Sequence, residues 1–184
     1  MCIFATALWA AEKPAPTSGT VIGILTAKCD AWIAVKAESD QEGIRYYAFW
    51  RGGAPNQGGG FDRQMIETIK KLPLANLVKV AWQVQEHRCI VSVEMIVPKE
   101  KAGTVVGTVV VKDDAWVDIK PEGGGPTERY TARWIGKGPK EGGGFDKEMI
   151  HVIAALAIGS KVRAKWTYDE RKRVIQIERL APPA

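Results

Sequence analysis

Short stretches of β-branched residues, or of alternating hydrophobic and polar residues, recur along the second half of the chain. Turn-forming Asp, Gly and Pro residues separate these stretches, which cover residues 104–111, 116–120, 129–134, 162–168 and 174–180. Both patterns are typical of β-strands, and strict alternation indicates a strand that buries one face. We therefore predict five strands in this half.

One further stretch has the periodicity of a helix. Its apolar residues are spaced along one helical face, at Phe145, Met149, Ile150, Ile153 and Leu156. Asp146 precedes them where an N-cap residue belongs, and the helix is predicted to end near Gly159. The order of elements is three strands, one helix and two strands.

The first half of the chain repeats this pattern without a gap, 84 residues earlier. Gly19 aligns with Gly103, and the register continues through Trp82 and Trp166. More than a third of the aligned positions between Gly19 and Ile96 are identical, which indicates a duplicated domain. We accordingly divide the chain into a signal segment and linker (1–17), a first domain (18–99) and a second domain (100–184).

The succession of three strands, one helix and two strands resembles the OB-fold, a five-stranded Greek-key barrel. The resemblance covers both halves and depends on element order, a glycine-bearing first strand and the place of the helix. It implies a mainly β chain of two tandem five-stranded OB-like Greek-key barrels, each with one α-helix between strands three and four. A small SH3-like barrel is the nearest alternative, but it lacks the long amphipathic helix.

Residues identical in both copies are predicted to fill the barrel interiors, because a common fold needs a common core. Positions that are apolar in both copies are predicted to face inward as well. The predicted core positions of the first copy are Ile33, Val35, Tyr46, Ala48, Trp50, Val78, Trp82, Val91 and Val93, with counterparts 84 residues later.

The intervening residues are predicted to face outward, on strands that OB-folds commonly use for binding. In the first copy the predicted ligand-binding residues are aromatic and basic: Trp32, Lys36, Arg45, Tyr47, Phe49 and Arg51. In the second copy they are more basic: Trp116, Lys120, Arg129, Arg133, Lys165, Arg171, Lys172 and Arg173. Rings stack on bases or sugars, and basic side chains hold a phosphate backbone. Burial against the sister domain is the alternative for the aromatic face.

The net charge of +5 adds to this picture, because the excess of Lys and Arg lies mainly in residues 101–184. It is compatible with single-stranded nucleic acid or acidic oligosaccharide as a partner. No Ser/His/Asp set or zinc-ligand spacing is present, so we predict neither an enzyme nor a cofactor or metal. The sequence favours a non-catalytic binding protein. The alternative is an envelope-associated module that binds or scaffolds other proteins.

Three consecutive glycines precede each predicted helix, at residues 58–60 and 142–144. Free amides at a helix N-terminus could hold a phosphate. No Gly-Lys-Ser/Thr follows, however, and the N-cap residues Asp62 and Asp146 compete for the same amides. We therefore predict tight structural turns with positive φ at the glycines.

Cys29 and Cys89 form a candidate disulfide. Their counterparts in the second copy are Asp113 and Arg173, which suggests a salt bridge at the matching place. Such a bond is chemically allowed in an exported protein. Free buried thiols, or a metal site completed by His87, are the alternatives.

Residues 2–11 form a short apolar run before a proline-rich linker. The run is too short to span a bilayer, and Ala7, Ala10 and Ala11 offer cleavage positions of an export signal, although no Lys or Arg precedes the run. We expect a periplasmic or secreted protein whose mature chain has no transmembrane span. A loose hydrophobic terminus on a cytoplasmic protein is the alternative.

Overall fold

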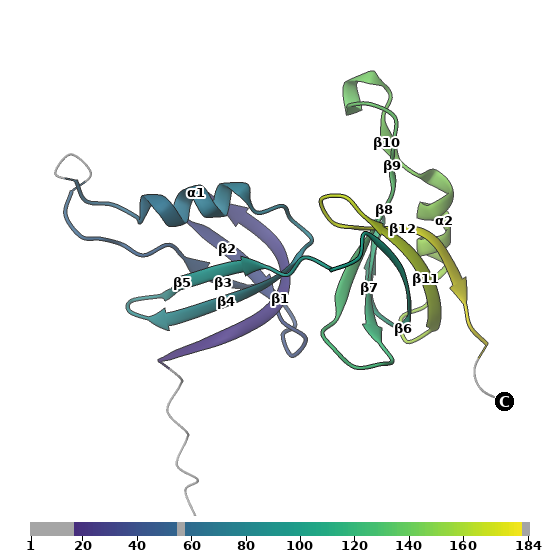
Figure 1. The fold of residues 1–184 in the computed structure, drawn as a ribbon, viewed down its shortest axis with the longest axis horizontal. Helices are drawn as coiled ribbons and strands as arrows, with labels where there is room; N and C mark the ends of the chain where they lie inside the picture. The colour runs from purple at the N-terminus through teal and green to yellow at the C-terminus, as the bar shows by residue number, and fades with distance from the viewer. Residues whose placement is uncertain (1–16, 55–57, 182–184) are drawn as a thin grey trace, which may run out of the picture.

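The structure is a computed structural model and describes residues 17–54 and 58–181. It is mainly β, with one closed barrel of five strands in each half of the chain and two α-helices (Figure 1). The predicted signal segment lies outside the described residues, apart from Thr17. Neither helix is long and apolar enough to cross a membrane.

The two barrels follow the predicted order of elements. The first contains β1 (Ser18–Cys29), β2 (Trp32–Lys36), β3 (Ile44–Tyr47), α1 (Arg63–Lys71), β4 (Leu77–Val84) and β5 (Arg88–Met95). The second contains β6 (Ala102–Asp113), β7 (Trp116–Pro121), β8 (Glu128–Ala132), α2 (Lys147–Ala155), β11 (Lys161–Tyr168) and β12 (Lys172–Arg179). A two-stranded sheet of β9 (Trp134–Ile135) and β10 (Gly144–Phe145) stands between β8 and α2.

Each barrel closes through its long first strand and one parallel pair. The N-terminal part of β1 pairs with β4, and its C-terminal part pairs with β2. Gly23 lies where the strand passes from one partner to the other, and a Cβ there would be 2.4 Å from the Lys36 carbonyl oxygen. The parallel pair joins β3 to β5, at Tyr47 and Cys89, and likewise joins β8 to β12.

The helices are held at both ends by side chains that recur in the two barrels. The carboxylates of Asp62 and Asp146 each accept two backbone amides of the first turn, so the predicted N-caps are confirmed. At the other end, the ammonium of Lys28 on β1 donates to the carbonyls of Ile69 and Leu72, at 3.2 and 2.7 Å. Lys112 on β6 donates in a similar way to the carbonyls of Ile153 and Ala154 at the end of α2. These lysines add a charged donor to the last carbonyls of each helix, where Ile69 and Ile153 also accept the backbone amide of the C-cap residue.

Most of the predicted core positions are buried, including Tyr46 and Tyr130 in the two barrel interiors. The prediction is wrong for Val91 and Ile175, which are exposed. Each is the extra residue of a β-bulge, because Trp82 pairs with Ile90 whereas Ala81 pairs with Ser92, and β11 and β12 repeat this shift. A bulge turns the following residues to the other face of the sheet.

The prediction is also wrong for Trp50 and Trp134, which lie beyond the ends of β3 and β8. Trp50 is 47% exposed and forms an isolated bridge with Phe61. Trp134 pairs in the same way with Phe145 in the small β9–β10 sheet. Each tryptophan therefore lies at the base of the loop that carries the three glycines, 58–60 or 142–144, instead of filling a barrel. We call each of these the glycine-rich loop of its barrel.

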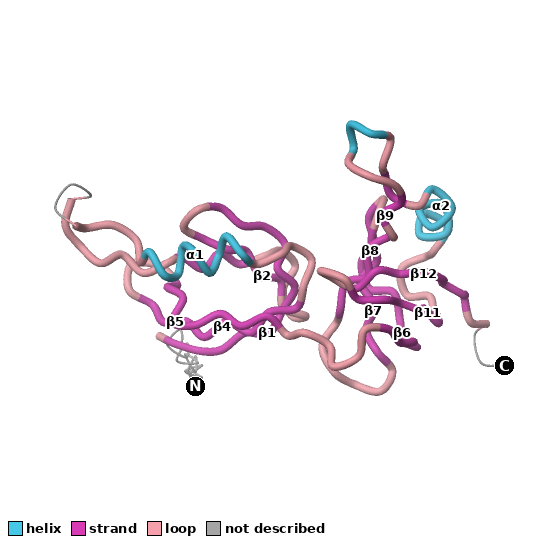
Figure 2. The backbone as a smooth tube through the Cα atoms, turned by 45° about the horizontal axis from the view of Figure 1, so that its top comes forward, coloured by secondary structure: helices cyan, strands magenta, loops and turns pink. Residues whose placement is uncertain are grey.

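The barrels lie side by side, and the β11–β12 hairpin of the second reaches the first (Figures 1 and 2). The side-chain amide of Asn76 donates to the Glu170 carbonyl at 2.8 Å, and its oxygen accepts from the Tyr168 hydroxyl at 3.4 Å. A second contact joins Lys120 to Glu38 across the barrels, at 2.6 Å.

Candidate functional site

Four rings of the first barrel line one open pocket of about 440 Å³, which we call the aromatic groove. One wall consists of the end of β3 and the base of the glycine-rich loop, and the other is the β4–β5 hairpin. The lining residues are Tyr47, Ala48, Trp50, Phe61, Gln85, Glu86, His87 and Cys89. The groove combines ring faces with one carboxylate and one amide.

The rings in the groove are already arranged in pairs. Tyr47 lies 5.1 Å from His87, centroid to centroid, with an interplanar angle of 35°. Trp50 meets Phe61 edge to face at 5.0 Å and 85°. Edge-to-face contact orients an aromatic side chain without covering its whole face, and Trp50 is about half exposed. A ligand ring can therefore stack in the groove without a large rearrangement.

The glycine-rich loop sets the position of Trp50 and Phe61. Gly58 and Gly60 have φ of 82° and 125°, so the predicted positive φ is confirmed there. A Cβ on Gly59 would lie 2.1 Å from the carbonyl oxygens of Gly52 and Gly53, so only glycine allows this close approach of two backbone segments.

The N-terminus of α1 is occupied by its own cap. Asp62 accepts hydrogen bonds from the amides of Gln64 and Met65, and it forms an ion pair with Arg51 at 2.6 Å. The hydrogen bond from Arg51, followed by those from the backbone amides, lowers the pKa of Asp62. The anionic cap leaves little attraction there for a phosphate.

The groove continues along the outer face of β3 and β2. Trp32 is paired in register with Tyr47, so the two side chains share one face of the sheet. The guanidinium of Arg45 lies over the Trp32 ring, 4.6 Å from its centroid. Arg45, Trp32, Tyr47 and His87 thus form one row. The predicted residue Phe49 lies apart from this row, in a neighbouring pocket with Arg51.

The second barrel has no equivalent of this open row. Thr131 stands in place of Tyr47 and is buried. The side chain of Arg129 is 10% exposed and donates to both carboxylate oxygens of Asp118, at 2.7 and 2.9 Å, while its guanidinium lies 3.3 Å from the Trp116 centroid. Burial raises the pKa of the Asp118 carboxyl, and the hydrogen bonds from Arg129 act in the opposite direction.

Most of the other predicted cations of the second barrel are also paired. Lys172 binds Glu128 and lies over the Trp166 ring, and Arg173 binds Asp169. Lys120 binds Glu38, and Arg171 lies 3.7 Å from Glu170. Arg133 and Lys165 are exposed. The basic composition of this half therefore overstates the positive charge that it offers to a ligand.

The two cysteines do not form the predicted disulfide. Cys29 is exposed, Cys89 is buried, and both thiols are free. Cys29 pairs with Trp32, Trp32 with Tyr47, and Tyr47 with Cys89. The cysteines are thus three strand spacings of about 4.8 Å apart along the barrel wall, and a disulfide needs adjacent positions. The matching salt bridge is wrong too, because Arg173 pairs with Asp169 instead of Asp113.

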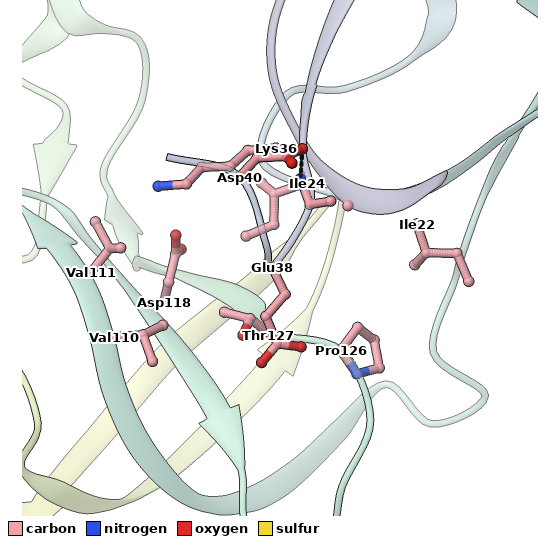
Figure 3. Close-up of a pocket in the computed structure, with 12 residues that line it drawn as sticks. Ile22, Ile24, Lys36, Glu38, Asp40, Val110, Val111, Asp118, Pro126 and Thr127 are labelled. Atoms are coloured by element: carbon pink, nitrogen blue, oxygen red, sulfur yellow. Dashed lines mark hydrogen bonds between the residues drawn. The ribbon is translucent and has the colours of Figure 1, made fainter. Parts of the chain in front are cut away.

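A second pocket, of about 390 Å³, lies between the barrels (Figure 3). Lys36, one of the predicted ligand-binding residues, lines it from the first barrel, and Asp118 lines it from the second. Figure 3 shows the Lys36 ammonium on the same side of the pocket as the Asp118 carboxylate. Lys36 is therefore not part of the aromatic groove.

Three rings of the groove were missed by the sequence reasoning. Trp50 was assigned to the core, Phe61 is the counterpart of Phe145 on the predicted helical face, and His87 was considered only as a metal ligand. Among residues 17–54 and 58–181, no group of three or more His, Cys, Asp or Glu could hold a metal ion. No protein-family model, curated protein or solved structure matches the chain. The residues of the aromatic groove are therefore the basis for assigning a function.

Proposed function

We propose that the chain is an exported, non-catalytic binding protein of two tandem OB-like barrels, and that the first barrel binds an oligosaccharide in the aromatic groove. The observation that carries this proposal is the gathering of Tyr47, Trp50, Phe61 and His87 around one open pocket. Stacking on such rings contributes roughly 1–3 kcal/mol per ligand ring, by analogy with bases on aromatic platforms.

The polar residues of the groove favour a sugar over a nucleic acid. Glu86 and Gln85 provide oxygens that accept hydrogen bonds from sugar hydroxyls. A phosphate backbone would be repelled by the Glu86 carboxylate. In the second barrel Lys120, Lys172 and Arg173 are paired with carboxylates, so the chain offers fewer cations to release counterions from a nucleic acid than its sequence suggests. A sugar with little charge therefore fits the groove best.

The second barrel supplies the substitutions for a test. Tyr47→Thr with His87→Arg replaces two groove residues by their counterparts Thr131 and Arg171. Tryptophan fluorescence titrations with chitin-type and cellulose-type oligosaccharides would measure binding, and an acidic hyaluronan-type oligosaccharide is the charged comparison. We expect one of the two uncharged sugars to bind the native chain more tightly than the acidic one, and we expect the double variant to lose about 5-fold to 100-fold in affinity.

Phe49→Arg is the matched control, because it also introduces a second-barrel residue but lies outside the groove lining. It should leave the affinity unchanged. Binding of oligothymidylate with a steep salt dependence, and of no sugar, would replace the proposal by a nucleic-acid function. Equal affinity of the double variant and the native chain would place the ligand elsewhere.

A further inference from the structure

The contact between the two barrels joins two structural features, a hairpin and a surface that receives it, and both features occur in each barrel. In the second barrel it is the β11–β12 hairpin, through Tyr168 and Glu170. In the first barrel it is the surface around Asn76, in the segment between α1 and β4, together with Met95, whose sulfur lies 4.0 Å from the Tyr168 hydroxyl. Each barrel therefore has a hairpin and a receptor surface, and only one of each is used within the chain.

The unused receptor surface is an open pocket of about 420 Å³ on the second barrel. Its lining residues are Ala157, Ile158, Gly159, Ser160, Lys161, Arg179 and Leu180. Ser160 and Arg179 are the counterparts of Asn76 and Met95, so the pocket occupies the place where the first barrel receives the hairpin. Ile158 is 66% exposed, whereas its counterpart Leu74, on the receptor surface already in use, is 37% exposed.

The unused hairpin joins β4 to β5 in the first barrel. Val84 takes the place of Tyr168 and is exposed, and Glu86 takes the place of Glu170. Figure 1 shows this hairpin and α2, which precedes the open receptor, at opposite ends of the molecule. The two unused surfaces of one chain therefore face away from each other.

We propose that a second copy of this chain is the partner for these surfaces: the β4–β5 hairpin of one copy docks into the pocket at residues 157–161 of the next. The side chains are complementary in chemistry. Exposed Val84 on the hairpin matches exposed Ile158 in the pocket. The Glu86 carboxylate matches the exposed cation Arg179, and Lys161, which binds Glu122 at 2.8 Å, lies in the same lining.

The contact is heterologous, so each added copy brings a new hairpin and a new pocket. Such contacts build an open series of copies unless the rotation between them closes a ring. Within one chain the linker raises the effective concentration of the hairpin near its receptor surface. Between separate chains this concentration is only that of the protein in solution. The association is therefore expected at high protein concentration, with a Kd of about 1 mM or below.

Sedimentation velocity of the full chain between about 10 μM and about 1 mM tests the proposal. We expect the mean mass to rise steadily with concentration and to pass beyond the dimer. Val84→Ser with Glu86→Lys removes the hairpin surface, and Ile158→Ser with Arg179→Ser removes the pocket. All four residues are exposed, so both variants should fold. Each variant alone should remain monomeric, and an equimolar mixture should form dimers and nothing larger, because only one intact pair of surfaces remains.

His151→Glu is the control, because it places the first-copy residue at an exposed position of α2 outside the pocket, and it should associate like the native chain. A native chain that stays monomeric over the whole range, or that stops at a dimer, would overturn the proposal. So would variants that still associate. The pocket variant leaves the aromatic groove untouched, so its sugar affinity reports on the proposed function separately.

Discussion

Equivalent outward positions of the two barrels differ in what they offer to solvent. In the first barrel Tyr47 and His87 form part of an open row of rings, whereas their counterparts Thr131 and Arg171 are buried and half-buried. In the second barrel Arg129 is locked onto Asp118 below the surface, at a place where the first barrel has Ala34. Similar barrel frameworks thus present accessible rings in one case and internally neutralised charge in the other. The two barrels therefore differ in which side chains a ligand can reach, and their composition alone does not show this difference.

The largest expected effect comes from breaking the buried ion pair of the second barrel. Asp118→Ala leaves Arg129 charged and largely buried without its partner, which should destabilise that barrel by about 3–5 kcal/mol. Urea denaturation would measure the loss. The double variant Asp118→Ala with Arg129→Leu removes both charges and should recover most of the stability. If the single variant has the same midpoint of urea unfolding as the native chain, the ion pair does not stabilise the barrel.

A smaller effect is expected at the helix caps. Asp62→Ala and Asp146→Ala each remove two hydrogen bonds to backbone amides and should each cost about 1 kcal/mol. Asp62 also has Arg51 as a partner, whereas the counterpart of Arg51 in the second barrel is Ile135, so we expect Asp62 to add a pH-dependent contribution to stability.

The sign of that pH dependence follows from the lowered pKa of Asp62. Its ionised form stabilises the folded chain above the unfolded-state pKa of about 3.9, and this contribution is lost as the pH falls through the lower folded-state pKa. Asp62→Asn keeps an acceptor for the cap but removes the charge, so it should flatten the acid side of the stability curve. A curve for Asp62→Asn parallel to that of the native chain would contradict the assigned charge effect.

The smallest effect is expected for Arg45, the more exposed of the two arginines that lie over tryptophans. Arg45 is exposed above Trp32, so Arg45→Ala should cost no more than about 1 kcal/mol of stability. Arg129→Ala should cost more, because it also leaves the buried Asp118 carboxylate unpaired. Parallel urea denaturation of the two variants would show the difference. Equal losses would mean that burial does not distinguish the two pairs.

The order of strands and helices could be predicted because alternation, helical spacing and the N-cap aspartates all have short-range causes. The bulges at Val91 and Ile175 could not, because a bulge keeps the same sequence pattern and changes only the register between strands. Trp50 and Trp134 were assigned to the core because they are identical in both copies. A shared residue can equally hold a shared loop, as their pairing with Phe61 and Phe145 shows.

The binding residues were predicted less well than the fold for a similar reason. Tyr47 was correctly assigned to the outer face of β3, but the sequence did not indicate that His87 would lie beside it, since that contact depends on the parallel pairing of β3 with β5. Likewise, Arg129 and Lys172 were predicted to face a ligand, because no local pattern shows that Asp118 and Glu128 bind them. Contacts between distant strands decide which charges stay free.

The lysine that closes each helix comes from a strand synthesised earlier. Lys28 precedes its acceptor Ile69 by 41 positions, so the cap for the last turn of α1 is already present when the ribosome adds that turn. Asn76, by contrast, must wait for Glu170, 94 positions later. During translation the first barrel can therefore complete its own contacts before its neighbour exists, and its receptor surface stays open until the final hairpin emerges.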